Sequence, residues 1–524
     1  MKSIIEQRVS QLLNGKLRQA LRGRKVGLEK ESLRVGSNGL ISQTRHPRGL
    51  GSALTHPSIT TDYSEALIEL VTPPFEHFDE TLKFLDDTHR YVYSQLEDEI
   101  LWSTSMPCVV DGDESIRIAE YGSSNAAKMK TAYRRGLGHR YGRKMQAIAG
   151  VHYNYSYPEQ FWLQYQQILG DKQDYQTFVS ESYIGMVRNL QRFGWLVPYL
   201  FGVSPAICGS FLNGSPTTLK KLFKHSYYGP QATSLRVGDI GYQNSKEGEA
   251  GIKVDYNSLQ GYVDSLSHAI STPCAEYQQI PLCADGEWQQ LNQNILQIEN
   301  EYYSSVRPKQ ILQGEEKPSL ALARRGVAYI ELRSLDVNPY EPLGINDEQM
   351  RFLESFLLFS LLLPSDPYLG DELAEIKHNI NLVAECGRDP QLQLRKGGKD
   401  ILLRDWANEI FDLMNLGCDL LDSGNATPVY CSSLQQQRAK IADSDLTPSA
   451  RLLAEMQENK EEFYDFSMRM SQQHQQWFAS RPLPAEQMAA YEAEARRSHE
   501  RQQEIEASDK LPFETFMQEY FAQS

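Results

Sequence analysis

Carboxylates stand at alternate positions in a stretch whose other residues are those of a β-strand. In residues 26–35, the two-residue period of a strand places Glu29 and Glu31 on the same face as Leu33 and Val35. Like charges on a buried or half-buried face are costly unless a cation or an ion pair lies between them. Magnesium is the cation that best suits all-oxygen ligands. The stretch therefore favours a sheet with one acid-lined face.

The same pattern recurs far away in the sequence. Residues 328–336 place Glu331 and Arg333 on one strand face, Glu69 lies in a run that is apolar on both faces, and residues 293–301 form a fourth acid-bearing candidate strand. A single Glu-x-Glu strand is more often a solvated surface. Several such segments, distant in sequence, instead favour a sheet whose one face is a metal-lined cleft.

Length and composition are those of an ordinary globular protein. The chain has 524 residues, 40% of them hydrophobic and 23% charged, and at roughly 150 residues per domain its length would allow three domains. The formal net charge of −15 argues against a nucleic-acid binder, which needs a basic stripe. The net charge does not argue against binding of an anionic nucleotide, because Mg²⁺ and a few nearby Arg or Lys residues determine that binding.

We expect a cytosolic protein with no membrane partner. Charges interrupt the first eight residues, which contain no apolar core of a secretory signal. The most apolar run, residues 352–363, is too short to span a bilayer and predicts a buried helix. The seven cysteines are scattered without any C-x-x-C spacing, which disfavours a disulfide framework and a structural zinc site.

The chain lacks a segment that marks a domain boundary. Strand-like and helical segments alternate from about residue 26 to 340, and after about 345 the pattern is almost entirely helical. We therefore expect one α+β domain over residues 1–524, with a sheet-containing core over 1–344 and a mainly helical part over 345–524 packed on it. Helical periodicity predicts helices over residues 5–22, 75–97 and 160–187, and alternating Glu and Arg residues predict an exposed helix over 485–508.

The common nucleotide-binding and hydrolase motifs are missing from the sequence. It contains no P-loop, no G-x-G-x-x-G after a strand, no H-E-x-x-H and no G-x-S-x-G. If the protein binds a nucleotide, it does so through metal bridges.

Other polar segments fit a small-molecule cleft. Alternation in residues 150–156 puts His152, Asn154 and Ser156 on one strand face. A lone strand histidine is usually structural, but a whole polar face is better explained as a cleft lining. Residues 232–242 and 303–309 add Arg, Lys and Tyr side chains, which suit carboxylates or phosphates, although a surface Arg is the commoner explanation for each alone.

Short segments along the chain carry a family resemblance: residues 26–34, 52–56, 60–62, 66–69, 150–154, 199–202, 204–208, 297–301 and 329–336. Together they resemble the proteobacterial type of glutamate-cysteine ligase and stand in that family's order over nearly the whole chain. The chain departs most from the family between about residues 365 and 445.

The resemblance implies a glutamine synthetase-like antiparallel sheet that forms an active-site funnel surrounded by helices. It also implies the ATP-dependent ligation of L-glutamate to L-cysteine, giving gamma-glutamylcysteine, ADP and phosphate in the first step of glutathione synthesis. The expected cofactor is Mg²⁺, or Mn²⁺ in its place, with ATP as co-substrate. Glutathione is the expected feedback inhibitor, and the expected state is a monomer without nucleic-acid partners.

The resemblance also implies roles for individual residues. Glu331 and Arg333 are the catalytic pair, with Arg333 contacting phosphate, and Arg236 binds the glutamate substrate. The residues that match the family's metal site are Glu29, Glu31, Asp62, Glu69, His152 and Glu331. The residues that match its cysteine pocket are Tyr133, Gln146, Tyr242 and Tyr303, together with Tyr63, where relatives can carry Phe.

Elementary chemistry agrees with this interpretation and leaves two alternatives. A carboxylate forms an amide only after its oxygen becomes a leaving group, as in an acyl phosphate, and clustered Mg²⁺ ions with one Arg suit that phosphoryl transfer. A related carboxylate–amine ligase could use another amine, although Tyr133, Gln146 and Tyr242 argue against this. A non-catalytic magnesium-binding or scaffold protein is the other alternative.

Overall fold

A seven-stranded antiparallel sheet lies at the centre of the molecule. The structure, a computed structural model, describes residues 2–14, 20–107, 109–241, 252–423 and 425–523. The strands follow the order β11-β12-β5-β1-β3-β2, and β4 pairs with the end of β1. Their bounds are β1 (Lys25–Gly36), β2 (Ile59–Thr61), β3 (Leu67–Val71), β4 (Glu99–Leu101), β5 (Gly150–Ser156), β11 (Val306–Lys309) and β12 (Tyr329–Asp336).

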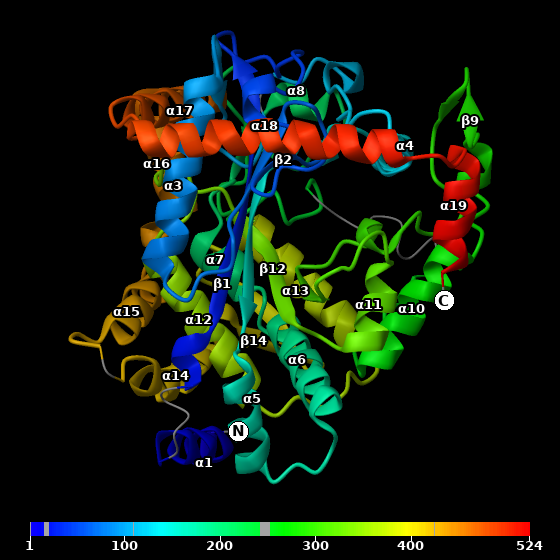
Figure 1. The fold of residues 1–524 in the computed structure, drawn as a ribbon. Coiled ribbons are helices and arrows are strands. Elements are labelled where there is room, and N and C mark those ends of the chain that lie inside the picture. The colour runs from blue at the N-terminus through cyan, green and yellow to red at the C-terminus, as the bar shows by residue number, and fades with distance from the viewer. Residues whose placement is uncertain (1, 15–19, 108, 242–251, 424, 524) are drawn as a thin grey trace.

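Helices surround this sheet, and α18 crosses the molecule near the top of Figure 1. The predicted α+β class, an antiparallel sheet enclosed by helices, is confirmed. The helices are α1 (Lys2–Asn14), α3 (Phe78–Gln95), α4 (Asn125–Tyr141), α5 (Glu159–Leu169), α6 (Tyr175–Arg192), α7 (Leu196–Phe201), α8 (Gly209–Leu212), α10 (Leu259–Ser271), α11 (Pro318–Arg325), α12 (Asp347–Leu362), α13 (Glu372–Cys386), α14 (Leu403–Leu421), α15 (Val429–Ala442), α16 (Pro448–Asn459), α17 (Phe463–Ala479), α18 (Ala485–Ser508) and α19 (Phe513–Ala522).

Short strands form three smaller sheets. They are β6 (Ala206–Cys208), β8 (Ser226–Tyr228) and β7 (Lys220–Leu222) in one sheet, β9 (Cys283–Ala284) with β10 (Glu287–Trp288), and β13 (Gln393–Lys396) with β14 (Lys399–Leu402). The last pair interrupts the C-terminal part, for which the sequence predicted helices almost throughout.

One cluster of buried apolar side chains extends from Ile5 to Leu483 and joins the sheet to the C-terminal helices. Within it, α12 is buried nearly all round, and its Glu354 forms an ion pair of 2.6 Å with Arg24 and accepts a hydrogen bond of 2.9 Å from Tyr155. None of the described helices is both long enough and apolar enough to cross a lipid bilayer.

Most predicted helices are confirmed, with two differences. The helices over 75–97, 352–363 and 485–508 occur as α3, α12 and α18. The helix expected over 160–187 is two helices, because Gly170 adopts a left-handed φ of 67° after α5. The helix expected over 5–22 is α1, which ends at Asn14, followed by a 3₁₀ turn; residues 15–19 lie outside the described residues.

The acid-bearing strand predicted over residues 293–301 was wrong. This segment is irregular and ends in a 3₁₀ turn, Glu299–Glu301. Side chains satisfy its backbone in place of a strand ladder: Glu301 Oε2 accepts from Gln297 N at 2.6 Å, and Gln297 Oε1 accepts from Leu291 N at 3.0 Å. Glu301 also pairs with Arg140 at 2.9 Å, so its carboxylate is a structural partner.

Candidate active site

The register of the sheet brings the predicted acids together. On β1, Glu29 stands opposite His152 of β5, and Glu31 stands opposite Glu69 of β3. On the other side of β5, Glu331 of β12 stands opposite Asn154. Strand alternation turns these side chains to one face, so residues that lie up to about 300 positions apart in the sequence meet there.

His152 is the centre of this cluster. Its Nδ1 lies 3.0 Å from Glu29 Oε2 and 3.5 Å from Glu331 Oε1, and its Nε2 lies 3.7 Å from Glu31 Oε1. Potential ligand atoms of Glu29, His152 and Glu331 lie within 4.8 Å of one another, as do those of Glu31, Glu69 and His152. The structure thus gathers every predicted metal residue except Asp62.

Asp62 follows β2 and lies close enough to affect its neighbours electrostatically. Burial, together with the negative charge of Asp62, raises the pKa of Glu31 to about 6, although His152 acts in the opposite direction. Burial and the charges of Glu29, Asp62 and Glu31 raise the pKa of Glu69 well above its usual value. The protein therefore places several carboxylates where they repel one another.

Glu331 has the opposite electrostatic environment. Burial opposes its ionisation, yet Lys309 and Arg333 hold the pKa of this carboxyl well below its usual range. Lys309 Nζ lies 3.6 Å from Glu331 Oε2, and Arg333 Nη1 lies 3.0 Å from Oε1. Glu331 is therefore ionised at neutral pH, and its Oε2 is buried without a hydrogen-bond donor among the described residues.

These residues fit a divalent cation. Four carboxylates and one imidazole converge, with Glu31 and Glu69 disfavoured as anions by their surroundings and Glu331 Oε2 lacking a hydrogen bond from the described chain. A cation among them would relieve both conditions. Carboxylate oxygens are the donors that suit Mg²⁺ and Mn²⁺, and the four carboxylates supply them.

A cavity of about 190 Å³ adjoins the metal-ligand candidates. Asp62 and Arg333 belong to its wall, so it opens onto the acid cluster. The other lining residues are Tyr63, Tyr133, Arg134, Leu137, Tyr141, Gln146, Asn300, Glu301, Tyr303 and Arg307. The predicted Tyr63, Tyr133, Gln146 and Tyr303 all line this cavity, whereas Tyr242 lies outside the described residues.

Sequence reasoning missed several residues of this cavity. Tyr133, Leu137 and Tyr141 recur at four-residue spacing on α4, so helical periodicity could have added the last two. Arg134 reaches the cavity while its Nε donates to the carbonyl of Asp62. Arg307 stands opposite Glu331 in the β11–β12 register, which no sequence pattern specifies.

Arg236, the predicted glutamate-binding residue, lies buried beside the acid cluster at 2% exposure. Its Nη2 donates to the carbonyl of Arg333 at 2.9 Å, and its Nη1 lies 4.0 Å from Asp336 Oδ1. Its Nε and Nη1 have no hydrogen-bond acceptor among the described residues. A buried guanidinium with donors to spare suits an anionic ligand.

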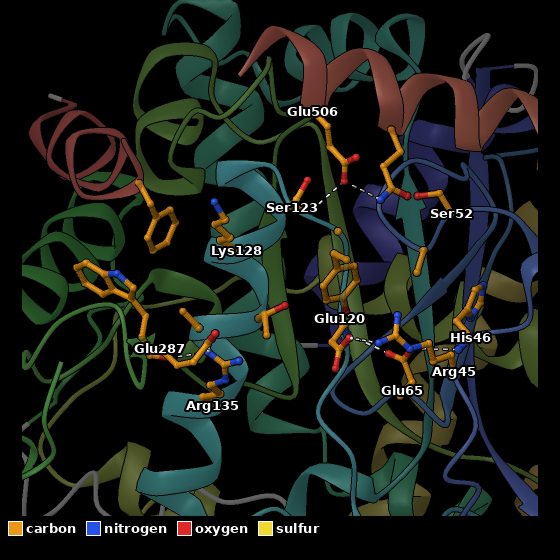
Figure 2. Close-up of a pocket in the computed structure, with 18 of the residues that line it drawn as sticks. Arg45, His46, Ser52, Glu65, Glu120, Ser123, Lys128, Arg135, Glu287 and Glu506 are labelled. Carbon is orange, nitrogen blue, oxygen red and sulfur yellow. Dashed lines mark hydrogen bonds and ion pairs between the residues drawn. The ribbon is translucent and has the colours of Figure 1, made fainter. Parts of the chain in front are cut away.

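A larger cavity, about 930 Å³, is shown in Figure 2. Its α4 residues lie about half a turn around the helix from those of the smaller cavity, so it is on the opposite side of α4. Lys128 and Arg135 of α4 line it, and none of the predicted site residues does. Its charges are partly paired, since Arg135 lies 2.6 Å from Glu287 and Arg45 lies 3.6 Å from Glu120. The predicted site residues lie at the smaller cavity beside the acids, so this cavity, and not the larger one, is the candidate active site.

Comparisons with known proteins point in the same direction. A sequence model of the family described as glutamate-cysteine ligase matches residues 9–383. The glutamate-cysteine ligase of Alcanivorax borkumensis is 46% identical over 522 residues, covering 99% of each protein. A crystal structure of glutamate-cysteine ligase from Francisella tularensis in complex with AMP matches with a TM-score of 0.89 and 36% identity, covering 95% of this chain and 97% of that one.

A further match is to a longer protein. The structure of a bifunctional glutathione synthetase from Pasteurella multocida has a TM-score of 0.71 and 26% identity with this chain, covering 90% of this chain and 54% of that one.

Proposed function

The chain belongs to the glutamate-cysteine ligase family, and on this premise we propose that it joins the gamma-carboxylate of L-glutamate to the amine of L-cysteine. The reaction consumes ATP and yields gamma-glutamylcysteine, ADP and phosphate, the first step of glutathione synthesis. The observation that carries this function is the acid cluster around His152 with Arg333 at its edge, next to a small tyrosine-lined cavity.

The acid cluster serves phosphoryl transfer. Glu29, Glu31, Glu69, Glu331 and His152 would hold Mg²⁺, with Mn²⁺ as a substitute and Asp62 nearby. When bound, the cation supplies positive charge against the phosphate oxygens. The residues that hold the cation thereby align ATP with the substrate carboxylate, and the site needs no side-chain nucleophile.

Arg333 and Arg236 divide the recognition of anions. Glu331 holds Arg333 through Nη1 and leaves other guanidinium donors to face the transferred phosphoryl group. Arg236 offers Nε and Nη1 to a carboxylate of glutamate. The cavity lined by Tyr133, Gln146 and Tyr303 takes the cysteine, whose amine attacks the acyl phosphate and expels phosphate. The family resemblance assigns Tyr242, outside the described residues, to the same pocket.

We also propose that the chain is a single catalytic domain and a cytosolic monomer that glutathione inhibits. The continuous apolar core supports the single domain. Large exposed apolar side chains lie in separate segments of the chain, such as Leu163, Leu369 and Trp477, which suits a monomer. Glutathione contains the gamma-glutamyl and cysteinyl groups of the product and would therefore compete for the same cavity.

The choice of amine acceptor is the first test. With ATP, Mg²⁺ and glutamate present, we expect phosphate release to depend on cysteine when each of the twenty amino acids is supplied in turn. A mixture without glutamate is the control and should release none. Faster turnover with another amino acid would identify a different carboxylate–amine ligase, and no turnover with any would leave a non-catalytic magnesium-binding protein.

The acyl phosphate makes a second prediction. With ATP, Mg²⁺ and glutamate but no cysteine, we expect an oxygen label in the β–γ bridge of ATP to scramble into the non-bridging β positions. Reversible transfer to glutamate produces this result when the β-phosphate of bound ADP rotates. Mass spectrometry of recovered ATP measures it, and omission of glutamate should abolish it.

Two outcomes of this experiment would contradict the acyl phosphate. Scrambling without glutamate would indicate a phosphorylated enzyme. No scrambling in either mixture, in an enzyme that makes product at normal rates, would favour a concerted route.

A further inference from the structure

Gly150 lies between the acid cluster and the buried Arg236. It is the first residue of β5, and its N–H donates to Glu31 Oε2 at 2.6 Å. On its other side, its Cα faces the guanidinium of Arg236. One residue therefore contacts both a candidate metal ligand and the candidate glutamate-binding side chain.

The space that a side chain at position 150 would need is filled by Arg236. A Cβ built on Gly150 would overlap Arg236 Nη2 and lie 2.7 Å from Cζ and 3.0 Å from Nε. The backbone itself does not require glycine, because Gly150 is a regular strand residue and is absent from the positive-φ positions of the described chain. Close approach of the guanidinium is thus the reason why a side chain is excluded here.

Arg236 is also held from the opposite side. Its Nη2 donates to the carbonyl of Arg333, and its Nη1 faces Asp336 at 4.0 Å. Asp336 is itself fixed, since it accepts hydrogen bonds of 2.7 Å from Ser204 Oγ and 2.8 Å from Ser234 Oγ. A guanidinium displaced from Gly150 would therefore have to leave these partners.

We propose that Gly150 is a positioning residue that sets the recognition of the glutamate substrate. Its missing side chain lets the Arg236 guanidinium lie close against β5, where Nε and Nη1 have no acceptor among the described residues and receive the substrate carboxylate. Its N–H also holds Glu31 in place. One residue therefore sets the distance between the metal site and the side chain that binds the substrate. This inference rests on the proposed function, in which Arg236 binds glutamate.

The Gly150→Ala variant tests this role. We expect its KM for glutamate to rise at least about tenfold while its KM for ATP changes less than about twofold, because the displaced group is the far end of a flexible side chain and the fold survives. Gly27→Ala is the matched control on the adjacent strand: its nearest neighbour, the carbonyl of Thr72, would lie 3.6 Å from the new Cβ, an ordinary contact. We expect wild-type kinetics for this control.

A double-mutant cycle separates positioning of Arg236 from a general structural effect. Once Arg236→Ala has removed the guanidinium, adding Gly150→Ala should change the KM for glutamate less than about twofold. Additive losses would overturn the inference, as would a wild-type KM in Gly150→Ala when Arg236→Ala is impaired. An unchanged KM in Arg236→Ala alone would instead contradict the proposed role of Arg236.

Folding offers a further measurement. If Gly150→Ala fails to fold, the double variant should regain a cooperative thermal transition, because the overlapping guanidinium is gone. A double variant that stays unfolded would show that something other than Arg236 excludes a side chain at position 150, which overturns the inference.

Discussion

Glu31→Gln should retain less than a tenth of the wild-type kcat at saturating Mg²⁺, a loss of more than about 1.4 kcal/mol in barrier terms. Glu31 lies among Glu69, Asp62 and His152, and an amide there removes one anionic oxygen ligand from the proposed cation site. Steady-state kinetics over a range of Mg²⁺ concentrations measures the effect. Glu120→Gln, at the larger cavity, is the control and should keep full activity.

The same variant should keep its fold. Because the pKa of Glu31 is raised to about 6, the folded protein binds this proton more tightly than the unfolded chain does. The folded state therefore loses stability as pH rises through this value. At pH 7 without metal, the amide should leave Tm equal to that of the wild type or higher. Mg²⁺ should raise Tm of the wild type and raise that of Glu31→Gln much less. A kcat above a tenth of the wild-type value with an undiminished Mg²⁺ shift would contradict the ligand assignment.

Arg333→Lys should lower kcat at least about tenfold, although it preserves the positive charge. Arg333 uses Nη1 to hold Glu331 at 3.0 Å, and its planar fork keeps further donors available beside the cavity. A lysine ammonium is a point charge and cannot hold Glu331 and face a phosphoryl group in the same geometry. Single-turnover kinetics with saturating ATP and glutamate measures the chemical step.

Arg135→Lys is the matched control for this experiment. Arg135 pairs with Glu287 at 2.6 Å on the opposite side of α4, away from the acid cluster, so its replacement should leave kcat unchanged. If Arg333→Lys also retained its kcat, Arg333 would be a structural partner of Glu331 and not a group that contacts phosphate.

Local alternation in the sequence predicted much of the site. The two-residue period of β1 correctly placed Glu29 and Glu31 on one face, and the same period on β12 placed Glu331 beside Arg333. These are short-range properties of an extended chain. The acids of residues 293–301 looked similar but lie outside the sheet, because the side chains of Glu301 and Gln297 bind the backbone there in place of a neighbouring strand.

The remaining geometry depends on strand register, which the sequence does not specify by itself. Nothing in the local pattern of these strands indicates that His152 of β5 stands opposite Glu29 of β1. The pairing of Glu31 of β1 with Glu69 of β3 is equally unspecified by the local pattern. The burial of Arg236 against Gly150 is likewise a tertiary contact between a loop and a strand. Such contacts follow from the packing of the whole chain.

Helix α4 separates the two cavities described above, with Tyr133, Arg134 and Tyr141 facing the candidate active site and Lys128 and Arg135 facing the larger cavity. The two faces of this helix therefore line different cavities and are constrained separately. The two cavities share no α4 residue, so substitutions on the larger cavity's side leave the lining of the candidate active site unchanged. Inserting one residue would rotate every following side chain by about 100° around the helix axis. Helix α4 can therefore tolerate substitutions on the face of the larger cavity, whereas an insertion there would also move the residues that line the candidate active site.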